Sequence, residues 1–204
     1  MHPNPAFRKE TDARAMAFAR DRGFGVLVVD GEASHIPFWL DDNRLEAHLT
    51  RANPILRALK AGPRPALLIV SGPDGYVSPD WYGGEADMVP TWNYVAAHLR
   101  GELKLADWDL HAHLDRLSDR FEASLAPKPV WKTAKMSPDA MKRMMRMILP
   151  VEMTVDSIAS TFKLNQNRSA MARAGAAAEL AKGTSAGLET AQLAALMRAL
   201  PADD

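Results

Sequence analysis

The alternation of apolar and polar side chains predicts a protein built mainly from antiparallel strands. Between residues 91 and 105, Trp92 and Tyr94 fall on one face of an extended chain, and Asn93 and Val95 fall on the other. Shorter apolar or β-branched runs indicate further strands. The predicted strands are 24–29, 34–40, 45–49, 65–70, 76–78, 91–105 and 150–155.

Turn residues lie between these runs. The dipeptide Asp30-Gly31 is favoured in two-residue hairpin turns, so the first two strands are expected to pair as a hairpin. Residues 41–43, Asp-Asp-Asn, predict a second turn, and residues 72–75, Gly-Pro-Asp-Gly, predict a third. A glycine-rich loop is expected to follow, through Met88.

Helical spacing of apolar residues and capping residues indicate peripheral helices. Asn53-Pro54 is a good helix start, because asparagine caps a helix and proline suits its first position. The predicted helices are 11–22, 55–60, 110–125 and 137–147, followed by an alanine-rich stretch from Ser169 to the end. That tail has few large side chains, so we expect it to be helical but weakly anchored.

These elements together predict a mainly β fold with peripheral helices. Six or seven strands with short hairpin turns fit a closed or partly closed antiparallel barrel, although alternation alone does not separate a barrel from a sandwich. A chain of 204 residues with 47% hydrophobic content supports one substantial core and an appendage. We expect one main domain over residues 1–156 and a C-terminal segment with the weakly anchored tail over 157–204.

Composition narrows the possible chemistry. Twenty-five basic residues balance twenty-five acidic ones, so any contact with DNA would have to be local. The absence of cysteine removes disulfides, thiolate metal sites and thiol nucleophiles, and the scattered histidines do not predict a metal site. The sequence contains no hydrolase elbow, dinucleotide fingerprint or phosphate loop. Without an apolar run of about 20 residues, we expect a cytoplasmic protein with no membrane contact.

Polar and aromatic residues are dense in five short segments, which are 34–38, 48–54, 76–82, 89–94 and 162–168. Their order, and especially Ser-Pro-x-Trp-Tyr at 78–82 with Val-Pro-Thr-Trp-Asn-Tyr at 89–94, resembles the PaiB family of FMN-binding negative transcriptional regulators. The resemblance runs from about residue 5 to 168. It implies the FMN-binding split β-barrel, shared with pyridoxamine-phosphate-oxidase-like and flavin-reductase-like proteins, and a homodimer with the flavin at its interface. Thr161 departs from the family, whose members usually carry lysine there.

The resemblance and the residue chemistry together give a set of expected FMN-binding residues. The set is His35, Ile36, Pro37, Phe38, His48, Thr50, Arg51, Asn53, Ser78, Trp92, Asn93, Tyr94, Lys163, Gln166 and Asn167. FMN needs a cationic, hydroxyl-rich pocket for its phosphate and an apolar or aromatic face for its ring. Arg51 and Thr50, which follow a strand and precede a helix start, are the best phosphate candidates, and Lys163 competes with Arg51 for that role.

Structural roles compete with binding at several of these positions. Asn53 could simply cap its helix, and the segment 34–38 could be an ordinary barrel strand. The aromatic residues of 92–94 could be core, and Trp81 and Tyr82 could pack at a subunit interface. His35 and His48 could line the pocket as neutral donors or could be satisfied buried histidines.

Three functions stay open. The first is an FMN-binding regulator that senses flavin or redox state, the second an FMN-dependent oxidoreductase acting on a small molecule, and the third a flavin-free interaction module. Residues 155–172 have a superficial helix-turn-helix spacing, but Lys163 stands where the turn usually has glycine. The sequence therefore leaves direct DNA reading and enzymatic activity undecided.

Overall fold

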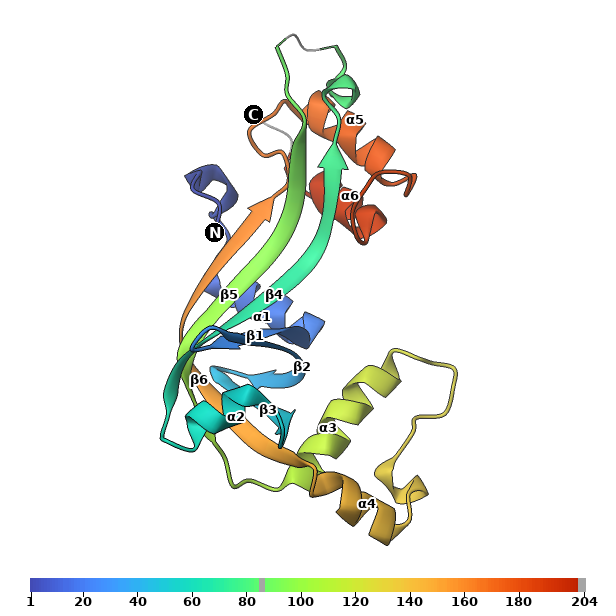
Figure 1. Cartoon of the computed structure of the whole chain (residues 1–204). Coiled ribbons are helices and arrows are strands. Elements are labelled where there is room, and N and C mark those ends of the chain that lie inside the picture. The colour runs from blue at the N-terminus through green and yellow to red at the C-terminus, as the bar shows by residue number, and fades with distance from the viewer. Residues whose placement is uncertain (85–86, 202–204) are drawn as a thin grey trace. The chain divides into compact units, whose positions relative to one another are not determined.

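The computed structural model, which describes residues 1–84 and 87–201, is a six-stranded antiparallel closed barrel with the strand order β1-β2-β3-β6-β5-β4 (Figure 1). The strands are β1 (Phe24–Val29), β2 (Glu32–Asp41), β3 (Arg44–Thr50), β4 (Arg64–Val77), β5 (Thr91–Leu105) and β6 (Ile148–Lys163). The helices are α1 (Asp12–Arg22), α2 (Pro54–Leu59), α3 (Leu110–Ala123), α4 (Pro138–Met145), α5 (Ala170–Leu180) and α6 (Thr190–Arg198). This architecture confirms the expected split barrel.

The chain forms two compact units. The barrel unit comprises residues 17–70 and 99–158, and the tail unit comprises residues 1–16, 71–98 and 159–204. Strands β4, β5 and β6 each contribute residues to both units. The division into domains at residue 156 stays a prediction.

The predicted hairpin of β1 and β2 is present, and at the predicted turn of residues 41–43 β2 pairs with β3 from Asp41 opposite Arg44. Asp30 (φ 50°) and Gly31 (φ 86°) form the turn between β1 and β2, whose register runs from Val29 opposite Glu32 to Phe24 opposite Pro37. Positive φ at both central positions is the geometry that matches the twist of a two-residue hairpin. Further along the sheet, β3 pairs with β6 over its whole length.

Alternation along the strands places one side-chain face in the barrel core, as the sequence predicts. The most deeply buried large side chains of the barrel unit include Leu27, Phe38, Leu40, Leu45, Leu68, Leu99, Leu103 and Met153. Burying one such side chain contributes about 1.5–3 kcal/mol. The core therefore fixes which strand residues remain on the outer face, where a ligand could reach them.

The predicted turn at residues 72–75 is wrong, because β4 continues through it. Within the tail unit, the N–H of Asp74 donates to the carbonyl of Leu188 at 2.9 Å, and the N–H of Tyr76 donates to that of Ala186 at 2.8 Å. A side chain at Gly75 would collide with Leu180. Local turn chemistry was thus overridden by pairing with a distant segment that sequence patterns did not reveal.

The expectation of a weakly anchored tail is also wrong over the described residues. The stretch is helical, but Leu180, Leu193, Ala194 and Met197 are completely buried within the tail unit. Small alanine side chains let α5 and α6 approach closely, which compensates for the shortage of large apolar residues. Residues 202–204 of this tail, and residues 85 and 86 of the predicted glycine-rich loop, lie outside the described part of the chain.

The segment with helix-turn-helix spacing does not begin with a helix. Residues 155–163 belong to β6, and a helix appears only at Ala170. Within residues 1–84 and 87–201, no helix has the length and apolar character needed to cross a membrane.

Candidate functional site

Strands β2 and β3 separate in the barrel unit near the residues expected to bind FMN. Residues 32–37 of β2 pair with β1, whereas the pairing of β2 with β3 covers residues 38–41. Asn53, just beyond β3, donates from Nδ2 to the hydroxyl of Ser34 at 2.9 Å. The fold therefore brings the first two predicted segments, 34–38 and 48–54, to one place.

The four predicted residues of β2 divide between the two faces of that strand. Ile36 and Phe38 point into the core with 2% and 0% of their surface exposed, so only their backbone could contact a ligand. His35 is exposed, and its ring centroid lies 6.3 Å from that of Phe24. His35 and Pro37 are the side chains of this segment that are available on the outer face.

Asn53 has a structural role. Besides its bond to Ser34, its Oδ1 accepts from the N–H of Ile55 at 3.0 Å, which makes Asn53 the N-cap of α2. Because α2 has only six residues, its macrodipole adds little to anion binding. The attraction for a phosphate at this end of the barrel must come from side chains.

Arg51 and Thr50 are both exposed at the end of β3. The guanidinium Nε of Arg51 donates to the carbonyl of Arg146, and the backbone N–H of Arg51 donates to the carbonyl of Met147 at 2.8 Å. Arg51 lines a cleft of about 910 Å³ bounded by α3, α4 and the start of β6. Lys142 and Arg146 add two further cations to this cleft, so it combines positive charge with walls of methionine and leucine.

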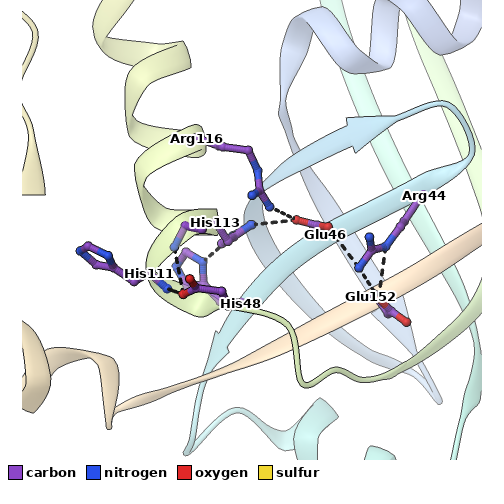
Figure 2. A network of polar contacts seen from close by, with 9 residues as sticks. Arg44, Glu46, His48, His111, His113, Arg116 and Glu152 are labelled. Carbon is purple, nitrogen blue, oxygen red and sulfur yellow. Dashed lines mark hydrogen bonds and ion pairs between the residues drawn. The ribbon is translucent and has the colours of Figure 1, made fainter.

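His48 lies on the outer face of β3 beneath α3, next to a buried polar network (Figure 2). Its Nδ1 is 3.2 Å from Nε2 of His113, and Nδ1 of His113 is 3.6 Å from Oε2 of Glu46. Burial lowers the pKa of His48. Burial, followed by the charge of His48, lowers the pKa of His113 to about 4, so His113 is neutral near pH 7.

A second cavity, of about 320 Å³, is lined by His48 and Pro37 from the strands. Its other walls come from α3 and the segment after it, and they are Leu114, Leu117, Ser118, Phe121, Glu122 and Trp131. The barrel unit therefore has two hollows close to predicted residues: a large cationic one at Arg51 and a smaller apolar one at His48.

Lys163 and Trp92 lie together in the tail unit. The ammonium group of Lys163 donates to the hydroxyl of Thr91 and, at 2.7 Å, to the carbonyl of Trp92. Burial, with the nearby charge of Arg168, lowers the pKa of Lys163. The ring of Trp92 is 46% exposed and meets Tyr76 edge-on at a centroid distance of 6.4 Å. Lys163 thus holds the start of β5 through hydrogen bonds, and the Trp92 ring remains exposed, so it could stack on a ligand.

The remaining predicted residues of the tail unit have mixed surroundings. Ser78 caps the short 3₁₀ turn Pro79–Tyr82. The side chain of Gln166 accepts from the N–H of Leu164 at 2.8 Å and donates to the carbonyl of Phe162, so it holds the preceding backbone. Asn93 is fully buried: its Nδ2 contacts the sulfur of Met197 at 3.5 Å, while its Oδ1 has no hydrogen-bond partner among the described residues. Tyr94 is half-buried and Asn167 is exposed. Eight predicted residues therefore lie in the barrel unit and seven in the tail unit.

The buried partners of His48 were not predicted from the sequence. Glu46 is only 6% exposed and His113 is fully buried, although both residue types usually lie at the surface or are paired. One signal was present: Glu46 and His48 are two positions apart in a strand and so share its outer face. A helix such as α3, which packs against that face, is then the natural source of a polar partner.

A family model matches residues 1–157 of this chain, and its description is "Putative FMN-binding domain". Protease synthase and sporulation protein PAI 2 of Bacillus subtilis (strain 168) is 29% identical over 174 residues, which are 80% of this chain and 82% of that protein. These findings confirm the predicted resemblance to the PaiB family.

Two solved structures have the same fold. The FAD and heme binding protein of Mycobacterium smegmatis superposes with a TM-score of 0.54 and 20% identity over 77% of this chain and 73% of that one. The flavocytochrome Anf3 of Azotobacter vinelandii superposes with a TM-score of 0.52 and 15% identity over 75% of this chain and 68% of that one. At these identities the comparison shows a common barrel architecture.

Proposed function

The chain belongs to the family of FMN-binding domains, with FMN as its cofactor, and from this premise we propose that it is a flavin-responsive negative regulator of transcription. FMN supplies redox chemistry when it is bound. In this proposal, the flavin or its redox state is the signal, and the protein acts as a cytoplasmic homodimer with the cofactor at its interface.

The donor set of the barrel unit fits FMN. Arg51 carries an exposed guanidinium whose Nε is already oriented by the carbonyl of Arg146, and Thr50 adds a hydroxyl beside it. A guanidinium held in this way suits a phosphate, which it can grip through two N–H groups. We assign the phosphate to Arg51 and Thr50, with Lys142 and Arg146 strengthening the positive field of the cleft.

Other expected residues of the barrel unit would serve the ring. His35 and Pro37 offer an outer face on β2, and the backbone of Ile36 and Phe38 lies alongside. Taken by itself, the tail unit offers an exposed aromatic surface at Trp92 and a cation at Lys163. Asn53, Ser78 and Gln166 would act indirectly, because their side chains hold the local backbone.

The regulatory part of the proposal is supported by the relative PAI 2, whose name links it to protease synthesis and sporulation. The net charge is zero and residues 155–163 form a strand, so a DNA contact would have to come from a local patch or through another protein. A gel shift on genomic fragments, at stated salt and with oxidised or reduced FMN, tests this role. A shift that depends on the flavin state supports it, and the lack of any shift contradicts direct binding.

A second candidate function is an FMN-dependent oxidoreductase. The observation in its favour is the 320 Å³ cavity with a histidine in its wall, which has the size and lining of a small-molecule site. Bleaching of the flavin by NAD(P)H under anaerobic conditions would favour the enzyme. A flavin that stays oxidised in the presence of NAD(P)H would favour the regulator.

A further inference from the structure

A chain of polar groups runs from the buried Glu46 and His113 to the half-buried His48, and FMN binding alone does not require it (Figure 2). His113, in its middle, is fully buried, and the ring of Trp108 covers it at a centroid distance of 4.7 Å. Nδ1 of His113 has no hydrogen-bond partner among the described residues, because Glu46 at 3.6 Å is beyond hydrogen-bond length. Such a group is costly to bury, so its retention calls for a reason.

Two arginines fix the carboxylate at the inner end of this chain of polar groups. Nη2 of Arg116 donates to Oε2 of Glu46 at 2.6 Å, and Nη2 of Arg44 lies 3.2 Å from Oε1. Arg44 is itself held by Glu152 at 2.9 Å (Figure 2). The Glu46 carboxylate therefore has a defined position, and it presents an acceptor to His113.

This arrangement determines which ring nitrogens carry protons. A carboxylate only accepts hydrogen bonds, so electrostatic attraction places the proton of neutral His113 on Nδ1, facing Glu46. Nε2 of His113 then has a lone pair, and Nδ1 of His48, 3.2 Å away, must be the donor between them. Neutral His48 is left with its lone pair on Nε2.

The cavity beside His48 offers little else that is polar. Glu122 is engaged by the ammonium of Lys128 and by the N–H of Trp131 at 2.8 Å, and Ser118 is a neutral hydroxyl. The other lining side chains are apolar or aromatic, and neither lysine nor arginine is among the lining residues described. A volume of about 320 Å³ is at the small end of ligand sites.

We propose that this cavity binds a small aromatic molecule bearing an acidic O–H or N–H group, which donates its hydrogen bond to Nε2 of His48. The contacts from Glu46 through His113 to His48 fix the tautomer of His48, so that its Nε2 can accept a hydrogen bond. The apolar walls take the body of the ligand, and the absence of a cation in the described lining disfavours anions. The cavity shares His48 and Pro37 with the residues expected to bind FMN, but the proposed hydrogen bond involves neither Arg51 nor Thr50, so this proposal does not depend on the phosphate site.

The tautomers are tested first, by long-range ¹H–¹⁵N correlation spectra of the FMN-loaded protein near pH 7. We expect His48 and His113 to carry their proton on Nδ1, whereas free imidazole side chains ordinarily prefer Nε2–H. In Glu46→Gln, the side-chain amide can donate to His113, so His48 should revert to Nε2–H. An Nε2–H proton on His48 in the unsubstituted protein would overturn the proposal.

Ligand binding is tested with 4-nitrophenol against 4-nitroanisole, which has nearly the same shape but no O–H group. The loss of one buried hydrogen bond corresponds to about tenfold, so the FMN-loaded protein should bind the phenol roughly tenfold more tightly. His48→Phe should abolish that preference, His48→Gln should restore part of it, and the exposed Lys60→Ala should leave it intact.

Two outcomes contradict the second site. Equal affinity for 4-nitrophenol and 4-nitroanisole in the unsubstituted protein would show that His48 is not the acceptor, whatever the fate of the variants. Displacement of FMN by 4-nitrophenol would show that the cavity belongs to the flavin site. Neither result would change whether the protein binds FMN, so the two proposals fail separately.

Discussion

Some of the predicted site residues use their side chains to hold the local backbone, and others keep exposed side chains. Asn53 was predicted both as a ligand and as a cap, and the hydrogen bond that its Oδ1 accepts from the N–H of Ile55 shows the cap. Arg51 was selected for its place between a strand and a helix start, but its guanidinium lines the cleft beside α4. The chemistry of Arg51 could be predicted from the sequence. The direction in which its guanidinium points could not, because it is set by a carbonyl 95 residues away in the sequence.

Arg51→Ala should weaken the binding of FMN about ten- to a hundredfold and change the binding of riboflavin little, because only FMN carries the phosphate. Flavin-fluorescence quenching with both ligands measures the two affinities. Arg57→Ala, which removes an exposed arginine of α2 outside the cleft, is the matched control and should leave both unchanged. Equal losses of affinity for FMN and riboflavin in Arg51→Ala would show that Arg51 does not bind the phosphate.

His113 should make stability depend on pH. Its pKa is lowered to about 4 in the fold against an ordinary value of 6.5, so the unfolded chain binds the extra proton first as pH falls. The contribution of His113 to stability is complete above about pH 6.5 and is lost between there and pH 4, by on the order of 3 kcal/mol. The groups that face it are Glu46 and His48 from β3 and Arg116 from α3, with Arg44 behind Glu46.

Urea unfolding at pH 7 and pH 4.5 measures this dependence. His113→Gln should flatten the difference between the two pH values, whereas His111→Gln, at an exposed position of the same helix, should keep it. The same slope in His113→Gln as in the unsubstituted protein would assign the pH dependence to other groups.

Among the elements, strands with clear alternation were predicted well and those shaped by distant partners were not. The predicted limits of the strand at 91–105 match β5, since its pattern is long and regular. The segments at 72–75 and 150–155 were predicted as a turn and a short strand, yet both lie inside long strands. In the first case, hydrogen bonds to residues 186 and 188 supply the partner that local sequence does not reveal.

The buried face of α6 predicts that the tail contributes to stability. Met197 is fully buried against the tail unit and contacts Asn93, so Met197→Ala should cost about 2–5 kcal/mol. Met171 in α5 is 73% exposed, and Met171→Ala should change stability by less than about 0.5 kcal/mol. Thermal and urea unfolding of the two variants measure the contrast. A Met197→Ala protein as stable as Met171→Ala would support the original prediction that the tail is weakly anchored.

At the scale of the whole molecule, the fold class and cofactor followed from the sequence, whereas assembly and biological role remain proposals. The family resemblance rested on motifs such as Val-Pro-Thr-Trp-Asn-Tyr, and the barrel confirms the fold that they implied. Oligomeric state depends on surface complementarity, which alternation along a strand does not encode.

We expect a homodimer in solution. Exposed apolar groups such as Trp92 (46%) and Phe24 (50%) are the kind of surface that an interface covers. Light scattering at micromolar concentration, with flavin bound, should give twice the 22.4 kDa mass of the chain. A mass of one chain under these conditions would contradict the proposed interface site.

The central claim is that this chain binds FMN, and the most direct test is the visible absorption spectrum of the purified protein, followed by extraction of the chromophore. Because cofactor can be lost during purification, the flavin-free fraction is also titrated with FMN. We expect a yellow protein, or one that becomes yellow on titration, whose extracted chromophore is FMN at about one per chain. A colourless protein that takes up no FMN would contradict it.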